Sequence, residues 1–125
     1  MTPTPLNILA VDDDISVTTS VKLVLKRSGC NVDVLNDSTE ALARLKELPP
    51  DHYDIIITDH AMPKMTGLEF LQQLPRSAFP GKVLVLSAYL DDKLEAQFLA
   101  VGANKIMRKP FEIDVLRQAI ESLRS

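Results

Sequence analysis

The strongest structural signal in the chain is an apolar run that ends on a carboxylate, and it reads Tyr53-Asp54-Ile55-Ile56-Ile57-Thr58-Asp59-His60-Ala61-Met62-Pro63. Three consecutive isoleucines, with no polar side chain between them, predict a strand that is buried on both faces, as in a parallel sheet. Asp59 follows this strand, and α/β sheets place their ligand sites at the carboxyl ends of their strands. We therefore take Asp59 as the candidate functional residue and test the rest of the chain against that choice.

Composition limits the class of protein. The chain has 125 residues, of which 46% are hydrophobic and 25% charged, and this is typical of one globular domain over residues 1–125. No apolar run is long enough to span a membrane, so we expect no membrane partner, and the single cysteine, Cys30, favours the reducing cytoplasm. The formal charge of −3 argues against a nucleic-acid surface. Cys30 is the only cysteine, which excludes an internal disulfide.

The remaining sequence alternates between strand and helix patterns. Apolar runs predict strands at residues 7–11, 31–35, 82–88 and 104–108. Helical spacing predicts helices at residues 16–28, 38–48, 67–74, 92–101 and 112–123. Strict alternation implies right-handed crossovers, so we expect an α/β fold with a doubly wound, five-stranded parallel sheet and five helices. The apolar residues expected to face inward on the helix at 92–101 are Leu94, Phe98, Leu99 and Val101. Those expected to face inward on the helix at 112–123 are Val115, Leu116, Ala119, Ile120 and Leu123.

Polar residues lie at or just beyond the carboxyl ends of four predicted strands: Asp12 and Asp13, Asp59, Ser87, and Lys109. In a doubly wound sheet these strand ends meet at one edge. Two carboxylates about 4 Å apart repel by roughly 4 kcal/mol at an effective dielectric constant of about 20. Three carboxylates and one ammonium sum to −2, so the pocket should take up a proton or a divalent cation. Oxygen ligands favour a hard ion, with Mg²⁺ preferred to Mn²⁺ or Ca²⁺.

Such a pocket is suited to phosphoryl transfer. A metal ion and an ammonium both neutralise charge on the phosphoryl oxygens. Asp59 can then act as the nucleophile and become an aspartyl phosphate. Ser87 could donate a hydrogen bond to a phosphoryl oxygen, and the small side chain of Ala88 leaves room for the incoming group.

The motifs Val11-Asp12-Asp13, Asp59-His60-Ala61-Met62-Pro63, Gly67, Leu86-Ser87-Ala88 and Lys109-Pro110-Phe111 occur in this order. With them, the chain resembles the receiver domains of two-component response regulators, including the chemotaxis regulators, over nearly its whole length. The resemblance implies the flavodoxin-like strand order 2-1-3-4-5. It also implies an autocatalytic phosphoprotein rather than a metabolic enzyme, with a sensor histidine kinase or phosphotransfer protein as partner. A second copy of the chain is a further candidate partner.

The resemblance assigns a role to each pocket residue. Asp59 is the phosphoacceptor. Asp13, Asp59 and the backbone carbonyl of Ala61 bind Mg²⁺ directly, and Asp12 acts mainly through water. Ser87 is the switch hydroxyl, and Lys109 contacts the phosphoryl group through a loop with a cis Lys109-Pro110 bond. The output surface is formed by the fourth helix, the fifth strand and the fifth helix.

One position departs from the family pattern. Receivers usually carry Tyr or Phe three residues before the lysine of the Lys-Pro pair, whereas this chain has Ile106. In the family, that aromatic ring turns inward as the switch hydroxyl moves toward the phosphoryl group. Isoleucine cannot repeat a ring rotation. Our hypothesis is that phosphorylation still occurs but moves the output surface differently or less.

Several alternatives stand beside this interpretation. Asp12-Asp13-Asp14-Ile15-Ser16 loosely fits the opening Asp-x-Asp motif of haloacid dehalogenase phosphatases, in which the nucleophile follows the first strand. A receiver that only binds partners is a third class. The chain could also be a piece of a longer DNA-binding regulator or hybrid kinase. His60, next to the acceptor, is expected to be an exposed residue at the rim of the pocket.

Overall fold

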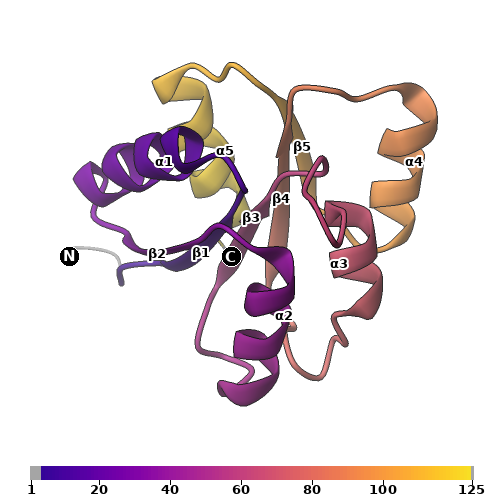
Figure 1. Cartoon of the computed structure of the whole chain (residues 1–125). Helices are drawn as coiled ribbons and strands as arrows, with labels where there is room; N and C mark the ends of the chain where they lie inside the picture. Colours follow the sequence, from indigo (N-terminus) through magenta and orange to yellow (C-terminus); the bar gives the residue numbers. More distant parts are fainter. Residues whose placement is uncertain (1–3, 125) are drawn as a thin grey trace.

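The computed structural model describes residues 4–124, and within this range five strands alternate with five helices (Figure 1). The strands are β1 (Asn7–Val11), β2 (Asn31–Leu35), β3 (Ile55–Thr58), β4 (Lys82–Ser87) and β5 (Lys105–Arg108). The helices are α1 (Ile15–Arg27), α2 (Ser38–Glu47), α3 (Gly67–Gln73), α4 (Asp92–Ala100) and α5 (Ile113–Leu123). The predicted order of elements is therefore confirmed, with boundaries displaced by a few residues.

All neighbouring strands pair in parallel, in the order β2-β1-β3-β4-β5. This is the order that the sequence resemblance implied. In the register, Val11 of β1 lies beside Thr58 of β3, and Thr58 lies beside Val85 of β4. The residues that follow β1 and β3 therefore emerge next to each other at one edge of the sheet.

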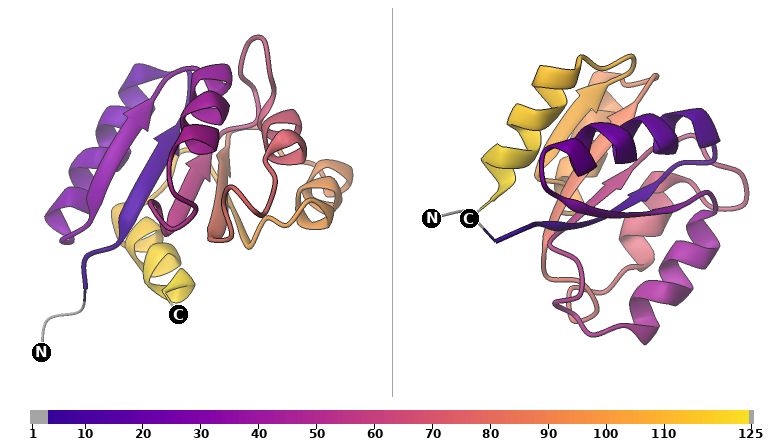
Figure 2. Two further views of the ribbon diagram at one scale, coloured as in Figure 1. Left: turned by 90° about the horizontal axis from the view of Figure 1, so that it is seen from below. Right: turned by 90° about the vertical axis from the view of Figure 1, so that its left-hand side faces the viewer.

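The three isoleucines of β3 show why the sheet is covered on both faces. Ile56 belongs to one core cluster, whereas Ile55 and Ile57 belong to the other. Successive side chains of a strand point to opposite faces, so an unbroken apolar run requires two cores. Buried side chains of α2, α3 and α4 complete the first cluster, and those of α1 and α5 complete the second. Figure 2 shows these two layers of helices on either side of the sheet.

Local capping sets the ends of the helices. Asp14 caps α1, and Asp37 caps α2 by accepting hydrogen bonds from the backbone N–H groups of Thr39 and Glu40. The spacing of Asp37 and Glu40 resembles a capping box, but the reciprocal box is found at Thr66 and Glu69, at the start of α3.

The structure corrects two expected core positions. Leu99 of α4 is 58% exposed and Val115 of α5 is 47% exposed. Leu99 lies next to Phe98 and Val115 lies next to Leu116, and both of these neighbours are fully buried. Adjacent helical residues are about 100° apart around the axis, so burying one of a pair turns the other toward solvent. In α4, Phe98 is the one side chain that is fully buried among the described residues.

Gly67 provides a test of how closely α3 approaches β3. A Cβ atom at this position would overlap the carbonyl oxygen of Asp59 and lie 2.9 Å from Cα of His60. We expect Gly67→Ala to lower the free energy of unfolding by roughly 3 kcal/mol, because backbone must move. Urea unfolding measures the change.

The matched control is Gly29→Ala. Gly29 has a φ of +90°, but a Cβ atom added there would meet no heavy atom of the described chain within 4 Å, its sequence neighbours aside. The substitution should cost only about 1 kcal/mol of backbone strain. Equal losses for the two variants would contradict the close approach of α3.

Candidate functional site

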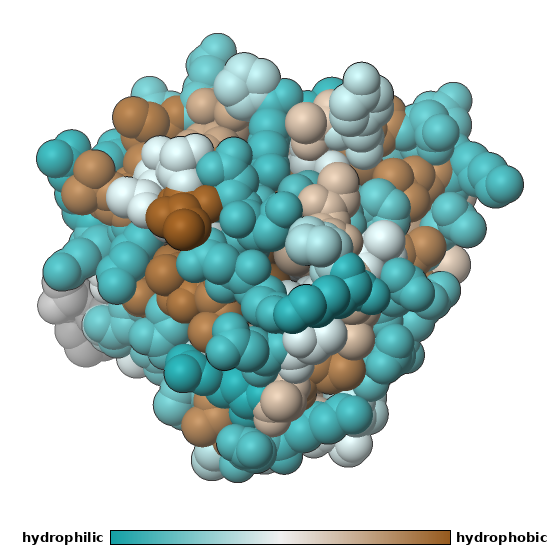
Figure 3. Space-filling model, in the orientation of Figure 1, coloured by the Kyte–Doolittle hydropathy of each residue, from teal (hydrophilic) through white to brown (hydrophobic). Residues whose placement is uncertain are grey.

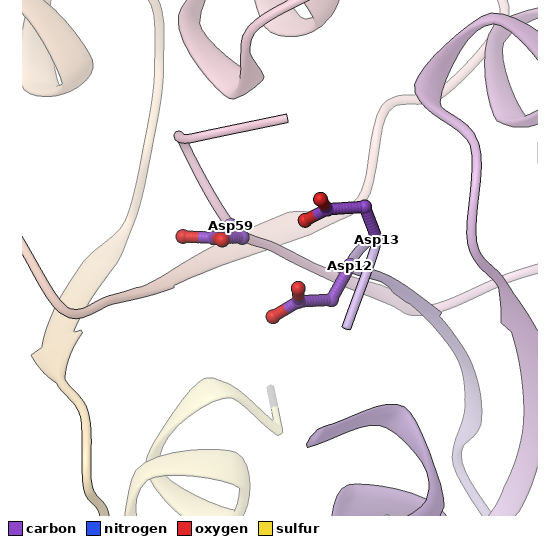
Figure 4. Close-up of side chains that lie close together, drawn as sticks. All are labelled: Asp12, Asp13 and Asp59. Carbon is purple, nitrogen blue, oxygen red and sulfur yellow. The ribbon is translucent and has the colours of Figure 1, made fainter. Parts of the chain in front are cut away.

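Three carboxylates meet where β1 and β3 end. Asp12 and Asp13 follow β1, Asp59 follows β3, and one oxygen from each lies within 4.8 Å of the others. Figure 4 shows the three side chains projecting into the same space beyond the strand ends. Asp12 and Asp59 are buried, whereas Asp13 is exposed. The cluster is thus open to solvent on the Asp13 side.

Backbone contacts hold the two buried carboxylates in place. The N–H of Asp12 donates to the carbonyl of Leu35 on β2, and the N–H of Asp59 donates to the carbonyl of Val11 on β1. Oδ1 of Asp12 accepts the N–H of Asp14, at 3.0 Å. Both residues thereby extend the sheet pairing by one position, which fixes the direction of their side chains.

Lys109 supplies the positive charge of the site from the loop after β5. Its Nζ lies 2.6 Å from Oδ2 of Asp12 and 3.2 Å from Oδ2 of Asp59. Its backbone N–H donates to the carbonyl of Ser87. The Lys109-Pro110 peptide bond is cis, as the resemblance implied. The lysine therefore bridges the ends of three strands.

The charges of the cluster act on one another. Burial raises the pKa of the Asp12 carboxyl. The hydrogen bonds from Lys109 and from the Asp14 N–H lower this pKa, but burial has the larger effect. Burial also disfavours the charged form of Lys109, but the adjacent Asp12 and Asp59 outweigh it and raise the pKa of the ammonium above its usual value. Lys109 is therefore protonated at neutral pH, and this single ammonium faces three carboxyl groups.

Ser87 and Ile106 lie on the two strands beyond β3. Ser87 ends β4 and is buried, and its hydroxyl donates to the carbonyl of Tyr89 over 3.4 Å, a long hydrogen bond. Ile106 on β5 is half-buried and packs on the cluster that contains Phe98. Ala88 and Ala61 are both exposed, next to Ser87 and His60 respectively.

His60 is the residue whose position the sequence failed to predict. It is half-buried rather than exposed at the rim. Its backbone N–H donates to Oδ1 of Asp59 at 2.7 Å, and its ring stands edge-on to Phe98, with ring centroids 5.4 Å apart. No sequence pattern could have revealed this contact, because the two residues are far apart in the chain and belong to different elements.

An apolar groove lies beside Lys109. It runs between α1 and the loop before α5, and the exposed Leu23 and Ile113 line it together with Lys109. Figure 3 shows hydrophobic side chains on the side of the molecule where α1 and α5 lie.

Among the described residues, no helix is both long and apolar enough to cross a membrane.

Comparison with known proteins identifies the family. The sequence model of the response regulator receiver domain matches residues 8–121. The chain belongs to this family. Receiver domains are the phosphoacceptors of two-component systems rather than conventional enzymes, and they interact with histidine kinases or phosphotransfer proteins. The predicted family is therefore confirmed.

Individual relatives agree with this assignment. The chain is 31% identical to the transcriptional regulatory protein TrcR of Mycobacterium tuberculosis, over 95% of this chain and 45% of TrcR. The chemotaxis protein CheY4 of Vibrio cholerae is 32% identical, with a TM-score of 0.87, over 96% of this chain and 99% of CheY4. The beryllofluoride-activated NtrC4 receiver dimer is 25% identical, with a TM-score of 0.84, over 94% of both chains. The chain thus spans about half the length of TrcR but nearly all of CheY4.

The acidic cluster of this receiver fits a divalent metal ion. Receiver domains typically bind Mg²⁺ at an acidic pocket. Here the donors are three carboxylates, which are the hard oxygen ligands that Mg²⁺ prefers. With Lys109, the cluster sums to −2, the charge that one divalent ion neutralises. The donor set and the charge balance both agree with Mg²⁺.

We expect Asp13→Asn to have opposite effects without and with Mg²⁺. Without the ion, the variant should be more stable than wild type, because one of three like charges is removed. With Mg²⁺, it should lose most of the stabilisation that wild type gains, which is about 2.7 kcal/mol when the free ion is at a hundred times its dissociation constant. Thermal unfolding with and without Mg²⁺ measures both effects.

Asp14→Asn is the matched control. Asp14 lies outside the cluster and caps α1, and asparagine is an equally good N-cap. This variant should keep the full Mg²⁺-dependent stabilisation. A similar loss in both variants would mean that the ion responds to the overall charge of the loop and not to the cluster.

Proposed function

We propose that Asp59 accepts a phosphoryl group from a histidine kinase or phosphotransfer protein in an Mg²⁺-dependent reaction. The main support for this proposal is the surroundings of the Asp59 carboxylate. It is buried, it lies within the acidic cluster, and it is 3.2 Å from the ammonium of Lys109. A nucleophilic carboxylate with a metal site on one side and a fixed cation on the other is suited to phosphoryl transfer.

The proposed reaction transfers the phosphoryl group from the imidazole of the donor to the carboxylate of Asp59. An oxygen of Asp59 attacks phosphorus, the bond between phosphorus and the donor's imidazole nitrogen breaks, and the imidazole keeps that electron pair. Asp13, Asp59 and the backbone carbonyl of Ala61 would hold Mg²⁺, with Asp12 acting mainly through water. When bound, the ion would supply charge neutralisation at the phosphoryl oxygens.

Lys109 and Ser87 complete the proposed site. The ammonium of Lys109 lies closer to Asp12 than to Asp59, and it can transfer its hydrogen bond to a phosphoryl oxygen. The Ser87 hydroxyl makes only a long hydrogen bond, so reorienting it toward the phosphoryl group costs little. We assign Ser87 as the switch hydroxyl, with Ile106 in the position of the usual aromatic partner.

The apolar groove offers a docking site for the phosphodonor. It opens beside Lys109, and its exposed side chains Leu23 and Ile113 would cover the apolar face of a helix that carries the donor histidine. A homodimer of this chain is a further proposal, supported by the dimeric NtrC4 receiver.

The proposal also covers the extent of the domain and its location in the cell. We propose that residues 1–125 form one receiver domain located in the cytoplasm, since response regulators are generally cytoplasmic. Two arrangements are proposed. The domain acts alone, since its length matches that of CheY4, or it forms part of a longer regulator or hybrid kinase. TrcR is about twice as long as the matched region, and a nucleic-acid-binding output would belong to residues outside these 125.

Labelling by acetyl phosphate distinguishes this proposal from the haloacid dehalogenase alternative. We expect Asp59→Asn to abolish labelling, because the amide is not a nucleophile. Asp12→Asn should slow labelling by about 10–100-fold without abolishing it, because Asp12 acts on the metal indirectly. Mass spectrometry of the intact protein measures the phosphoryl adduct.

The reverse pattern would favour the phosphatase, whose nucleophile follows the first strand. In that case labelling would survive in Asp59→Asn and disappear in Asp12→Asn. Asparagine is close to aspartate in size, so both variants should keep the fold. Their circular dichroism spectra check this.

A further inference from the structure

The usual relay from the phosphorylation site to the output surface is incomplete in this chain. Ile106 on β5 packs in the same core cluster as Phe98 of α4, but it has no ring to turn inward. A second aromatic contact, however, joins the acceptor loop to α4. The ring of His60, the residue after Asp59, stands at 87° to the ring of Phe98, with centroids 5.4 Å apart.

The backbone of His60 is tied directly to the acceptor. Its N–H donates to Oδ1 of Asp59, at 2.7 Å. A carboxylate is a strong acceptor, and hydrogen bonds to charged groups are about twice as strong as those between neutral groups. On phosphorylation, Oδ1 becomes either the oxygen that bridges carbon and phosphorus or a neutral carbonyl oxygen. In both cases the hydrogen bond from His60 weakens.

The other contacts of His60 direct any movement toward α4. Its carbonyl accepts the N–H groups of Met62 and Gly67, and Nδ1 accepts the N–H of Leu68 over 3.4 Å. A Cβ atom on Gly67 would overlap the Asp59 carbonyl, so α3 already lies at the closest approach. The peptide between Asp59 and His60 therefore has little room on the α3 side.

Phe98 is well placed to receive this movement. It is 0% exposed, and it is the one fully buried side chain that the described structure assigns to α4. Leu94 and Val101 are only half-buried. Packed cores shift between discrete arrangements and do not deform smoothly, so displacing Phe98 requires the helix to move with it.

We propose that the contact between the rings of His60 and Phe98 couples the phosphorylation state of Asp59 to the position of α4. This inference rests on the proposed function of Asp59. His60 is a positioning residue: its side chain acts through Phe98, and only its backbone N–H contacts the acceptor. The coupling depends on the shape of the ring. Phenylalanine should replace it, and alanine should not.

The test uses the full chain with beryllofluoride and Mg²⁺, which mimic the phosphoryl group at Asp59. NMR spectra give the shift changes of the α4 amides, residues 92–100, and separately those around Asp59. In wild type and in His60→Phe, both regions should respond. In His60→Ala, the α4 response should fall by roughly threefold or more, while the response around Asp59 remains.

His52→Ala is the matched control. His52 also stands edge-on to an aromatic ring, that of Tyr53, with centroids 4.6 Å apart. It precedes β3, whereas the acceptor follows that strand. Its loss should leave the α4 response unchanged. If His60→Ala does not fold, Phe98→Leu removes the other ring while keeping an apolar side chain, and it should weaken coupling in the same way.

The outcomes separate the two proposals. A wild-type α4 response in His60→Ala, with beryllofluoride bound, overturns the coupling and leaves the proposed function intact. Loss of the response in His60→Phe as well overturns the role of ring shape. Wild-type protein that shows no beryllofluoride response around Asp59 overturns the proposed function, and the coupling with it.

Discussion

The structure depends on the balance of charge among Asp12, Asp59 and Lys109. Two buried carboxylates would repel each other strongly, and removing their charge from water is costly. The ammonium of Lys109 lies within hydrogen-bonding distance of both and makes their burial tolerable. The exposed Asp13 adds a further negative charge that the lysine does not offset. One ammonium therefore faces three carboxylates, and the site remains attractive to cations.

This balance requires distant parts of the chain to meet. Lys109 is separated from Asp12 by 97 positions, and the parallel sheet brings them together. The register places Val11, Thr58 and Val85 side by side, so the residues beyond them emerge at one edge. Two hydrogen bonds continue this pairing beyond the strands, from the N–H of Asp12 to Leu35 and from the N–H of Asp59 to Val11.

The two sides of the site differ in how firmly they are held. Asp12 and Asp59 continue the sheet pairing and have little freedom. In contrast, α4 is anchored mainly through Phe98, and Leu99 is turned to solvent. Elements with few buried contacts are those that move in signalling transitions. Asp59 is therefore held more firmly than α4, and this difference is what the proposed coupling requires.

The fold class, the family and the residues that converge on the pocket were all predictable from the amino-acid sequence. The fold class and the pocket were predictable because the isoleucine run, the alternation of elements and the polar strand ends are local patterns. The family was predictable because the motifs of the chain resemble those of receiver domains. Ile106 was likewise visible as a departure from the family. In contrast, the outward direction of Leu99 and Val115 and the contact made by the ring of His60 became known only from the folded chain. These depend on how each helix is rotated against the sheet, and that rotation is set by packing between elements distant in the sequence.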